Sequence, residues 1–117
     1  MKNTDLKQRT KDFALRVIRM TESLPRTVAA DVLGKQLLRS ATSVAANYHS
    51  ACRGRSKSEF VAKLGIVEEE ADESALWIEL IDEAGILPSA KLTAIHAEAR
   101  ELTAIMVSSI RTARQRD

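Results

Sequence analysis

The sequence is poor in the residues that cross-link or interrupt a small fold. Cys52 is the one cysteine in 117 residues, so an internal disulfide and a cysteine-rich zinc site are both excluded. Four glycines and two prolines are too few for the many turns of an all-β domain. Aromatic residues make up only 3% of the chain, so the core has to be built from leucine, isoleucine, valine and alanine. These shortages together favour a helical domain.

Long hydrophobic runs are also missing. No apolar segment approaches the ~20 residues needed to cross a bilayer. The opening stretch, MKNTDLKQRTKDF, lacks the hydrophobic segment of a signal peptide. We therefore expect a cytoplasmic protein with no membrane segment, folded as a single domain over residues 1–117.

Charged residues are abundant, at 29% of the chain, but the two signs are unevenly spread. Residues 57–85 hold nine acidic and two basic side chains, whereas the remainder holds sixteen basic and seven acidic ones. An acidic helix packed beside basic helices would explain this pattern. A basic outer surface that meets an anionic partner is the alternative explanation.

Apolar residues recur at steps of three and four in four segments, which predicts four helices. The first runs over about Asp5–Leu24, and the second over about Val28–Cys52 with Thr27 as its N-cap. Gly34 lies inside the second helix, where it would permit another helix to approach closely.

The third helix begins after Ser56, which forms a capping box with Glu59, and Gly85 is its expected C-cap. The fourth helix follows Pro88 and Ser89. Short connections near residues 24–27, 52–56 and 85–89 imply that neighbouring helices are antiparallel. The sequence therefore predicts an all-α fold, an antiparallel up-down-up-down four-helix bundle.

A polar stripe lies directly beside the apolar stripe of the second helix. Because buried polar groups must be paired, we expect it to meet polar groups of the third helix, with Asn47 hydrogen-bonded across the two helices. Such a seam would fix the register of the bundle, although a substrate pocket or a seam between subunits would use the same residues. The predicted seam consists of Ser40, Ser43, Asn47, Glu70, Glu73 and Ser74.

The third helix also has apolar residues on a second side, where Leu76, Trp77 and Leu80 lie near its end. A helix with two apolar sides indicates a partner surface as well as a core face. We therefore predict Trp77 and Leu80 as oligomer contacts. Ordinary burial of Trp77 in the core is the alternative.

The run LLRSATSVAANYHSACRGRSKSEFVAKLGIVEEEADES resembles the signature of a four-helix-bundle family, the 23S ribosomal RNA intervening-sequence proteins. The resemblance is strongest over residues 37–80. Ser50 and Ala51 stand where the common form of the signature has Glu-Gly, so a role of that carboxylate does not carry over. The matching residues are Arg39, Ser43, Val44, Asn47, Arg55, Ser56, Phe60, Leu64 and Glu73.

The resemblance implies a small bacterial protein that forms a homopentamer of antiparallel bundles. Some members are encoded within insertions of ribosomal RNA genes. A similar bundle is the accessory subunit of diversity-generating retroelements, where a basic pentameric barrel binds nucleic acid and a reverse transcriptase. We accordingly expect a non-enzymatic oligomeric protein associated with RNA, with no cofactor and no small-molecule substrate. The basic candidates for phosphate contacts are Arg39, Arg53, Arg55, Arg111 and Arg114.

A metal-dependent enzyme is the competing function class, together with a regulatory partner protein that has a site in the bundle. Bundles that hold two metals use glutamate three residues before histidine, and neither His49 nor His96 has such a glutamate. His49 and Cys52 are one helical turn apart and would supply two ligands at most. We therefore predict no metal site.

Overall fold

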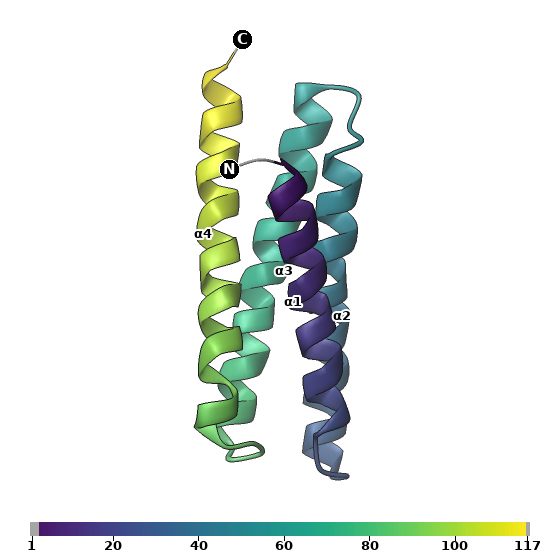
Figure 1. Cartoon of the computed structure of the whole chain (residues 1–117), viewed down its shortest axis with the longest axis vertical. Coiled ribbons are helices and arrows are strands. Elements are labelled where there is room, and N and C mark those ends of the chain that lie inside the picture. The colour runs from purple at the N-terminus through teal and green to yellow at the C-terminus, as the bar shows by residue number, and fades with distance from the viewer. Residues whose placement is uncertain (1–2, 117) are drawn as a thin grey trace.

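Four long helices pack side by side in the computed structural model, which describes residues 3–116 (Figure 1). They are α1 (Asn3–Glu22), α2 (Val28–Ala51), α3 (Lys57–Glu83) and α4 (Thr93–Gln115), and a short 3-10 helix, η1 (Ser89–Lys91), precedes α4. The chain runs down α1, up α2, down α3 and up α4, so each helix is antiparallel to the next. The predicted all-α four-helix bundle is confirmed. No helix of this described part is both long and apolar enough to cross a membrane.

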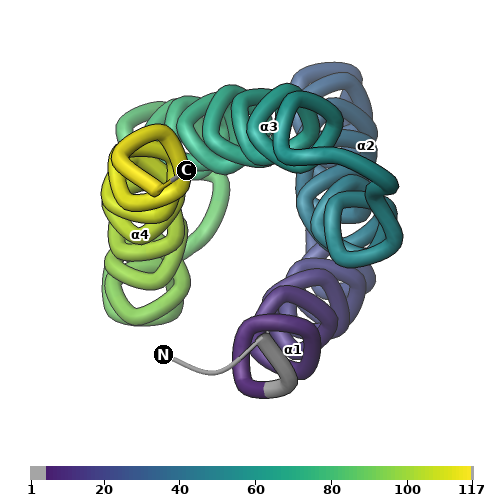
Figure 2. Tube along the Cα trace, turned by 90° about the horizontal axis from the view of Figure 1, so that it is seen from above, coloured from purple at the N-terminus to yellow at the C-terminus, as the bar shows by residue number. Residues whose placement is uncertain are grey.

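The order of the helices around the bundle follows their order in the chain. Figure 2 looks along the bundle and shows α2 between α1 and α3, and α3 between α2 and α4. The bundle is elongated, with extents of 50 × 19 × 19 Å. Arg9 of α1 connects the first helix to the last. Its guanidinium donates to both carboxylate oxygens of Glu98 at 2.8 Å and lies 3.0 Å from Glu101.

The predicted N-caps of α2 and α3 are confirmed. The Thr27 hydroxyl accepts from the backbone N–H of Ala30, and the Ser56 hydroxyl accepts from that of Glu59, each at 3.1 Å. The Glu59 carboxylate returns to the N–H of Arg55 at 2.7 Å, one residue before the cap itself. The bonds from Ala30 and Glu59 each satisfy a donor that the first turn of a helix leaves unpaired.

Three helix boundaries differ from the prediction by two residues or more, and the first is the start of α1, which lies at Asn3 instead of about Asp5. α1 ends at Glu22 because the N–H groups of Ser23 and Leu24 bond three residues back, and because Pro25 disfavours helical geometry in the residue before it. α4 begins only at Thr93, since the turn after Pro88 closes with the three-residue spacing of η1.

Gly85 has the role that the sequence predicts for it, whereas Gly34 permits the approach of the α1–α2 connection and not of another helix. Gly85 follows α3 with φ +69°, and the N–H groups of Gly85 and Ile86 bond to the carbonyls of Asp82 and Ile81, as in a Schellman ending. At Gly34 a Cβ would lie 2.6 Å from Cδ1 of Leu24, so the absent side chain lets the α1–α2 connection lie against α2.

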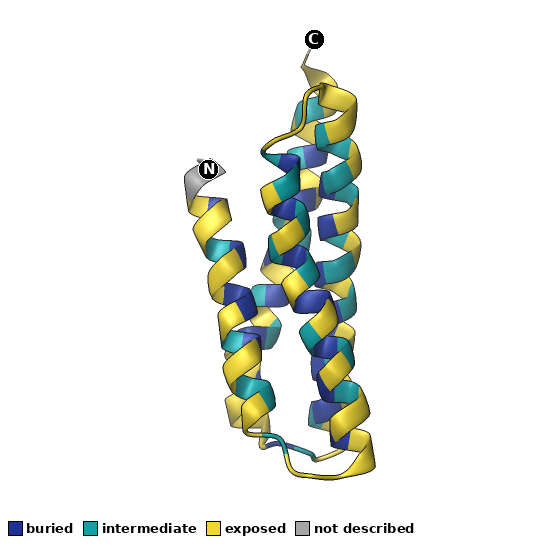
Figure 3. Ribbon diagram, turned by 90° about the vertical axis from the view of Figure 1, so that its right-hand side faces the viewer, coloured by how far each residue is buried: buried dark blue, intermediate teal, exposed yellow. Residues whose placement is uncertain are grey.

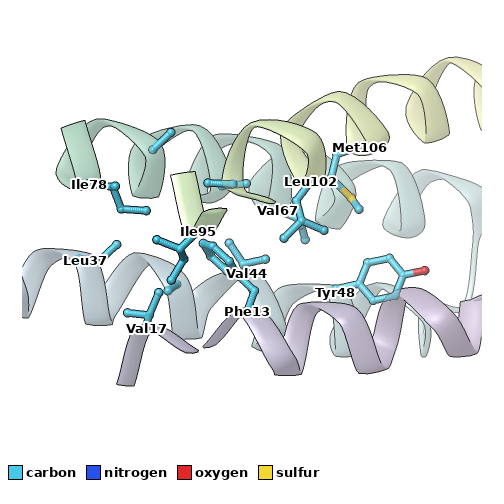
Figure 4. Close-up of a cluster of buried hydrophobic side chains, with 14 of the residues drawn as sticks. Phe13, Val17, Leu37, Val44, Tyr48, Val67, Ile78, Ile95, Leu102 and Met106 are labelled. Atoms are coloured by element: carbon cyan, nitrogen blue, oxygen red, sulfur yellow. The ribbon is translucent and has the colours of Figure 1, made fainter. Parts of the chain in front are cut away.

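The core lies where the buried faces of all four helices meet (Figure 3). The predicted apolar stripes supply it, although Met20, Leu24 and Phe60 are only partly buried. Fully burying one leucine, isoleucine or valine side chain of this core stabilises the fold by about 1.5–3 kcal/mol. Figure 4 shows the centre of this cluster, which includes Phe13, Val17, Leu37, Val44, Leu102 and Met106.

Candidate nucleic-acid interface

Figure 1 shows that the connection between α2 and α3 lies at the same end of the bundle as the end of α4. The antiparallel topology brings residues 46–69 and 104–116 to this end, and they hold seven lysine and arginine residues against three acidic ones. Residues 70–103, toward the opposite end, hold two basic and eight acidic ones. We call the first region the basic end; its arginines and lysines are Arg53, Arg55, Lys57, Lys63, Arg111, Arg114 and Arg116.

Most of these cations have no internal counter-ion. Arg53, Arg55, Arg111 and Arg114 are exposed, and within residues 3–116 their side chains form no ion pair. Four of the five predicted phosphate contacts therefore lie at one end of the molecule with their charge unbalanced. Such a cluster produces a positive potential that attracts anions.

Arg39 differs from the other four predicted arginines. It lies in the middle of α2, where its Nη1 is 3.2 Å from Oε1 of Glu70 and its Nη2 is hydrogen-bonded to Glu73. Its Nε also donates to Gln36 at 3.2 Å. Arg39 is therefore separate from the basic end, and two carboxylates balance its charge.

Lys57, Lys63 and Arg116 also lie at the basic end, although they are not among the five predicted phosphate contacts. Lys57 donates to the backbone carbonyl of Arg116, which connects the start of α3 to the end of α4. Lys63 is half-buried and shares a surface pocket with Arg53 and His49. For Lys57 and Arg116 the signal was available in the antiparallel topology, which places the first turns of α3 beside the last turns of α4.

A groove of about 800 Å³ lies at the same end, between the described start of α1 and the ends of the other helices. Its floor is mainly apolar and includes Leu6, Phe60 and Ile105, and Lys57 and Arg116 are among its lining residues.

The predicted polar seam is centred on two serines. The hydroxyls of Ser40 on α2 and Ser74 on α3 are 2.8 Å apart, and both residues are 0% exposed. Ser74 also bonds to the carbonyl of Glu70 at 2.8 Å, and Ser40 to that of Leu37 at 3.2 Å. Because both hydroxyls find protein partners, the pair is satisfied inside the core.

The outer residues of the predicted seam are arranged differently. The Asn47 amide donates to the carbonyl of Ser43 in its own helix at 2.9 Å, so the bond to α3 that we predicted for it is not the one formed. The carboxylates of Glu70 and Glu73 pair with Arg39 instead. A charge-assisted bond to a guanidinium is stronger than a bond to a neutral amide, which explains this choice of partner.

Trp77 and Leu80, the predicted oligomer contacts, are only partly covered. Trp77 is half-buried against the core, and its Nε1–H donates to Oε1 of Glu73 at 3.2 Å. Leu80 is 39% exposed, and Leu76 beside it is 47% exposed. The outer side of α3 therefore presents large apolar side chains to its surroundings.

The candidate metal ligands do not come together in the described residues. His49 is exposed and Cys52 is half-buried on α2, and His96 of α4 bonds through Nε2 to Oε2 of Glu79 on α3 at 2.7 Å. Within residues 3–116, no three histidine, cysteine, aspartate or glutamate side chains are placed to hold one metal ion.

Tyr48 lies beside Cys52 and has an altered acidity. Burial raises the pKa of the Tyr48 phenol well above its ordinary value, and the Cys52 thiol raises it further.

Comparisons with known proteins agree with this fold. A family model described as 23S rRNA-intervening sequence protein matches residues 2–108. A solved structure of unknown function from the S23 ribosomal protein family of Bacteroides thetaiotaomicron VPI-5482 is similar, with a TM-score of 0.85 and 29% identity. The alignment covers 95% of this chain and 99% of that one. No curated protein gives a significant match.

Proposed function

Because the chain belongs to the family of 23S rRNA-intervening sequence proteins, we propose that it is a non-enzymatic, cytoplasmic accessory protein that binds RNA through its basic end. The observation that supports the proposal is the group of four exposed arginines without internal counter-ions. Arg53 and Arg55 lie in the α2–α3 connection, and Arg111 and Arg114 lie near the end of α4. Arginine is well suited to phosphate because its planar donors match the phosphate oxygens.

The binding we propose is directed mainly at the phosphate backbone. The two phenylalanines, one tyrosine and one tryptophan of the chain are all buried or half-buried, so no exposed aromatic platform is available for stacking bases. Contacts to phosphate release counter-ions, and the affinity then falls steeply as salt rises. We therefore expect weak dependence on RNA sequence and strong dependence on ionic strength.

The test is a titration of a labelled single-stranded RNA at several salt concentrations. Arg53→Ala/Arg55→Ala and Arg111→Ala/Arg114→Ala should each weaken binding and reduce the slope of log K against log salt by about 1–2. Arg26→Ala/Lys91→Ala is the matched control, because it removes two exposed, unpaired cations from the other end of the bundle. Equal losses in the control, or no RNA binding by the wild type at low salt, would refute the proposal.

We also propose that the protein acts as a homo-oligomer with Trp77 and Leu80 among its contacts, and a pentamer is the stoichiometry that the family resemblance implies. The supporting observation is the exposed apolar side of α3. Light scattering should give a mass of five chains of 12.9 kDa. A mass of one chain at micromolar concentration would reject the oligomer.

A further inference from the structure

The outer faces of α1 and α3 carry stripes of the same design and opposite charge. On α1, Lys7, Lys11, Leu15 and Ile18 follow one another at steps of four, four and three, so they share one face of the helix. On α3, Glu69, Glu73, Leu76 and Leu80 follow at steps of four, three and four. Each stripe therefore has two charged residues followed by two large apolar ones.

The apolar parts of both stripes are unusually exposed. Leu15 and Ile18 are 42% and 37% exposed, and Leu76 and Leu80 are 47% and 39% exposed. These four make up half of the large apolar side chains that the described part of the chain leaves exposed. Two such patches on one small bundle indicate surfaces that are covered in an assembly.

The two stripes also correspond in position and direction. Leu15 is seven residues before the end of α1 at Glu22, and Leu76 is seven residues before the end of α3 at Glu83. α1 and α3 run in the same direction, toward the same end of the bundle (Figure 1). An offset of 62 residues, or 61 for the pair Leu15 and Leu76, therefore aligns lysine with glutamate and apolar with apolar along two parallel helices.

The charges needed for such a contact are available. Lys7 and Lys11 are exposed and form no ion pair within the described chain, and Glu69 is likewise exposed and unpaired. Glu73 is already paired with Arg39 and accepts from Trp77, so Glu69 is the acidic residue of the α3 stripe whose charge is available to a second copy. α2 lies between α1 and α3 in the bundle (Figure 2), so these stripes do not meet within one copy.

We propose that the outer stripe of α1 in one copy packs, parallel and in this register, on the outer stripe of α3 in the next copy. This inference rests on the proposed oligomer and names its two surfaces. The contact is heterologous, because each copy contributes a different face to each of its two neighbours. Contacts of this kind close into rings of any number of subunits, odd numbers included, whereas a single isologous contact stops at a dimer.

The proposal is tested by cross-linking between copies. In a Cys52→Ala background, which removes the native thiol, Ile18→Cys/Leu80→Cys should give a ladder of covalent oligomers with a short bis-maleimide. Ile18→Cys alone and Leu80→Cys alone should stay monomeric under denaturing conditions, since in the proposed contact neither residue lies beside the same residue of a neighbouring copy. Ile18→Cys/Val107→Cys is the matched control, because Val107 on α4 is 38% exposed and outside both stripes.

A second measurement tests the charge pairing without touching the core. Lys7→Glu and Glu69→Lys should each shift the light-scattering mass toward one chain at low concentration, and the double variant should restore the wild-type mass. If the wild type is oligomeric but the paired cysteines give no ladder, or if Ile18→Cys alone gives dimers, this interface is wrong and the oligomer stands. A monomeric wild type would reject the proposed oligomer itself.

Discussion

The hydroxyl pair of Ser40 and Ser74 allows a quantitative test of how the bundle core is held in register. Ser74→Ala removes the 2.8 Å contact between the two hydroxyls and the bond to the Glu70 carbonyl. Ser40 keeps the Leu37 carbonyl as a partner, so no buried group is left unpaired. Two net hydrogen bonds of about 1 kcal/mol each are lost, and alanine returns about 0.5 kcal/mol through its higher helix propensity. We expect a net loss of about 1–1.5 kcal/mol.

The double variant Ser40→Ala/Ser74→Ala separates pairing from burial. With both hydroxyls gone, the site has no polar atom that needs a hydrogen-bond partner. The double substitution should therefore lower the free energy of unfolding by clearly less than the sum of the two single substitutions. The difference, which is the coupling free energy, should be about 1 kcal/mol, within the range known for contacting residues.

Urea unfolding followed by circular dichroism measures these differences. A loss of about 1 kcal/mol should lower the midpoint by about 0.5 M urea if the slope is near 2 kcal/mol/M. All variants have to be compared at one protein concentration, because assembly adds to apparent stability. Additive single costs would show that the two hydroxyls do not stabilise one another, and the register would then need another explanation.

Three further predictions follow from the geometry. Asn47→Leu should lower stability by under about 1 kcal/mol in the same urea assay, since Asn47 is half-buried and bonds only to the Ser43 carbonyl of its own helix; a loss of 3 kcal/mol would contradict this. Gly85→Ala should cost about 1 kcal/mol from its φ of +69° alone, because nothing lies within 4 Å of the added Cβ; an unchanged thermal midpoint would count against a left-handed cap. The raised pKa of Tyr48 keeps its phenol protonated in the folded state, whereas the phenol of the unfolded chain ionises above the ordinary tyrosine pKa of 10. The free energy of unfolding should therefore fall as pH rises past 10. Tyr48→Phe should make that fall less steep.

Much of the fold could be predicted because local sequence signals determine it. Residues such as Phe13, Val44 and Leu102 recur at helical spacing, and the caps at Thr27 and Ser56 mark helix starts independently of packing. The boundary error at the start of α4 occurred where no side-chain signal decides the matter. The turn after Pro88 closes as a 3-10 helix, and neither Leu92 nor its neighbours supply a side-chain cap for α4.

The candidate site could be predicted less fully, because it depends on distances between helices. Periodicity shows that Arg39 and Asn47 lie toward the outer part of α2, but not which of them reaches the carboxylates of α3. That choice depends on the axial register of the two helices, which the Ser40–Ser74 contact reveals only in the structure. The same limit applies to Lys63, whose place beside Arg53 follows from three-dimensional proximity and not from its neighbours in sequence.

The asymmetric attachment of α1 has a consequence for the motions of the bundle. α2 and α3 pack extensively against one another, whereas α1 packs mainly on α2 and has little contact with α4 beyond the region of the Arg9 bridge. An element with fewer tertiary contacts opens at a lower free energy than the rest of the fold. Amide protons of α1 should therefore exchange with solvent through detachment of this one helix, at rates that global unfolding does not limit. Each detachment would uncover the side of α2 against which Phe13 and Val17 normally pack, so the association of exposed chains should begin with the release of α1.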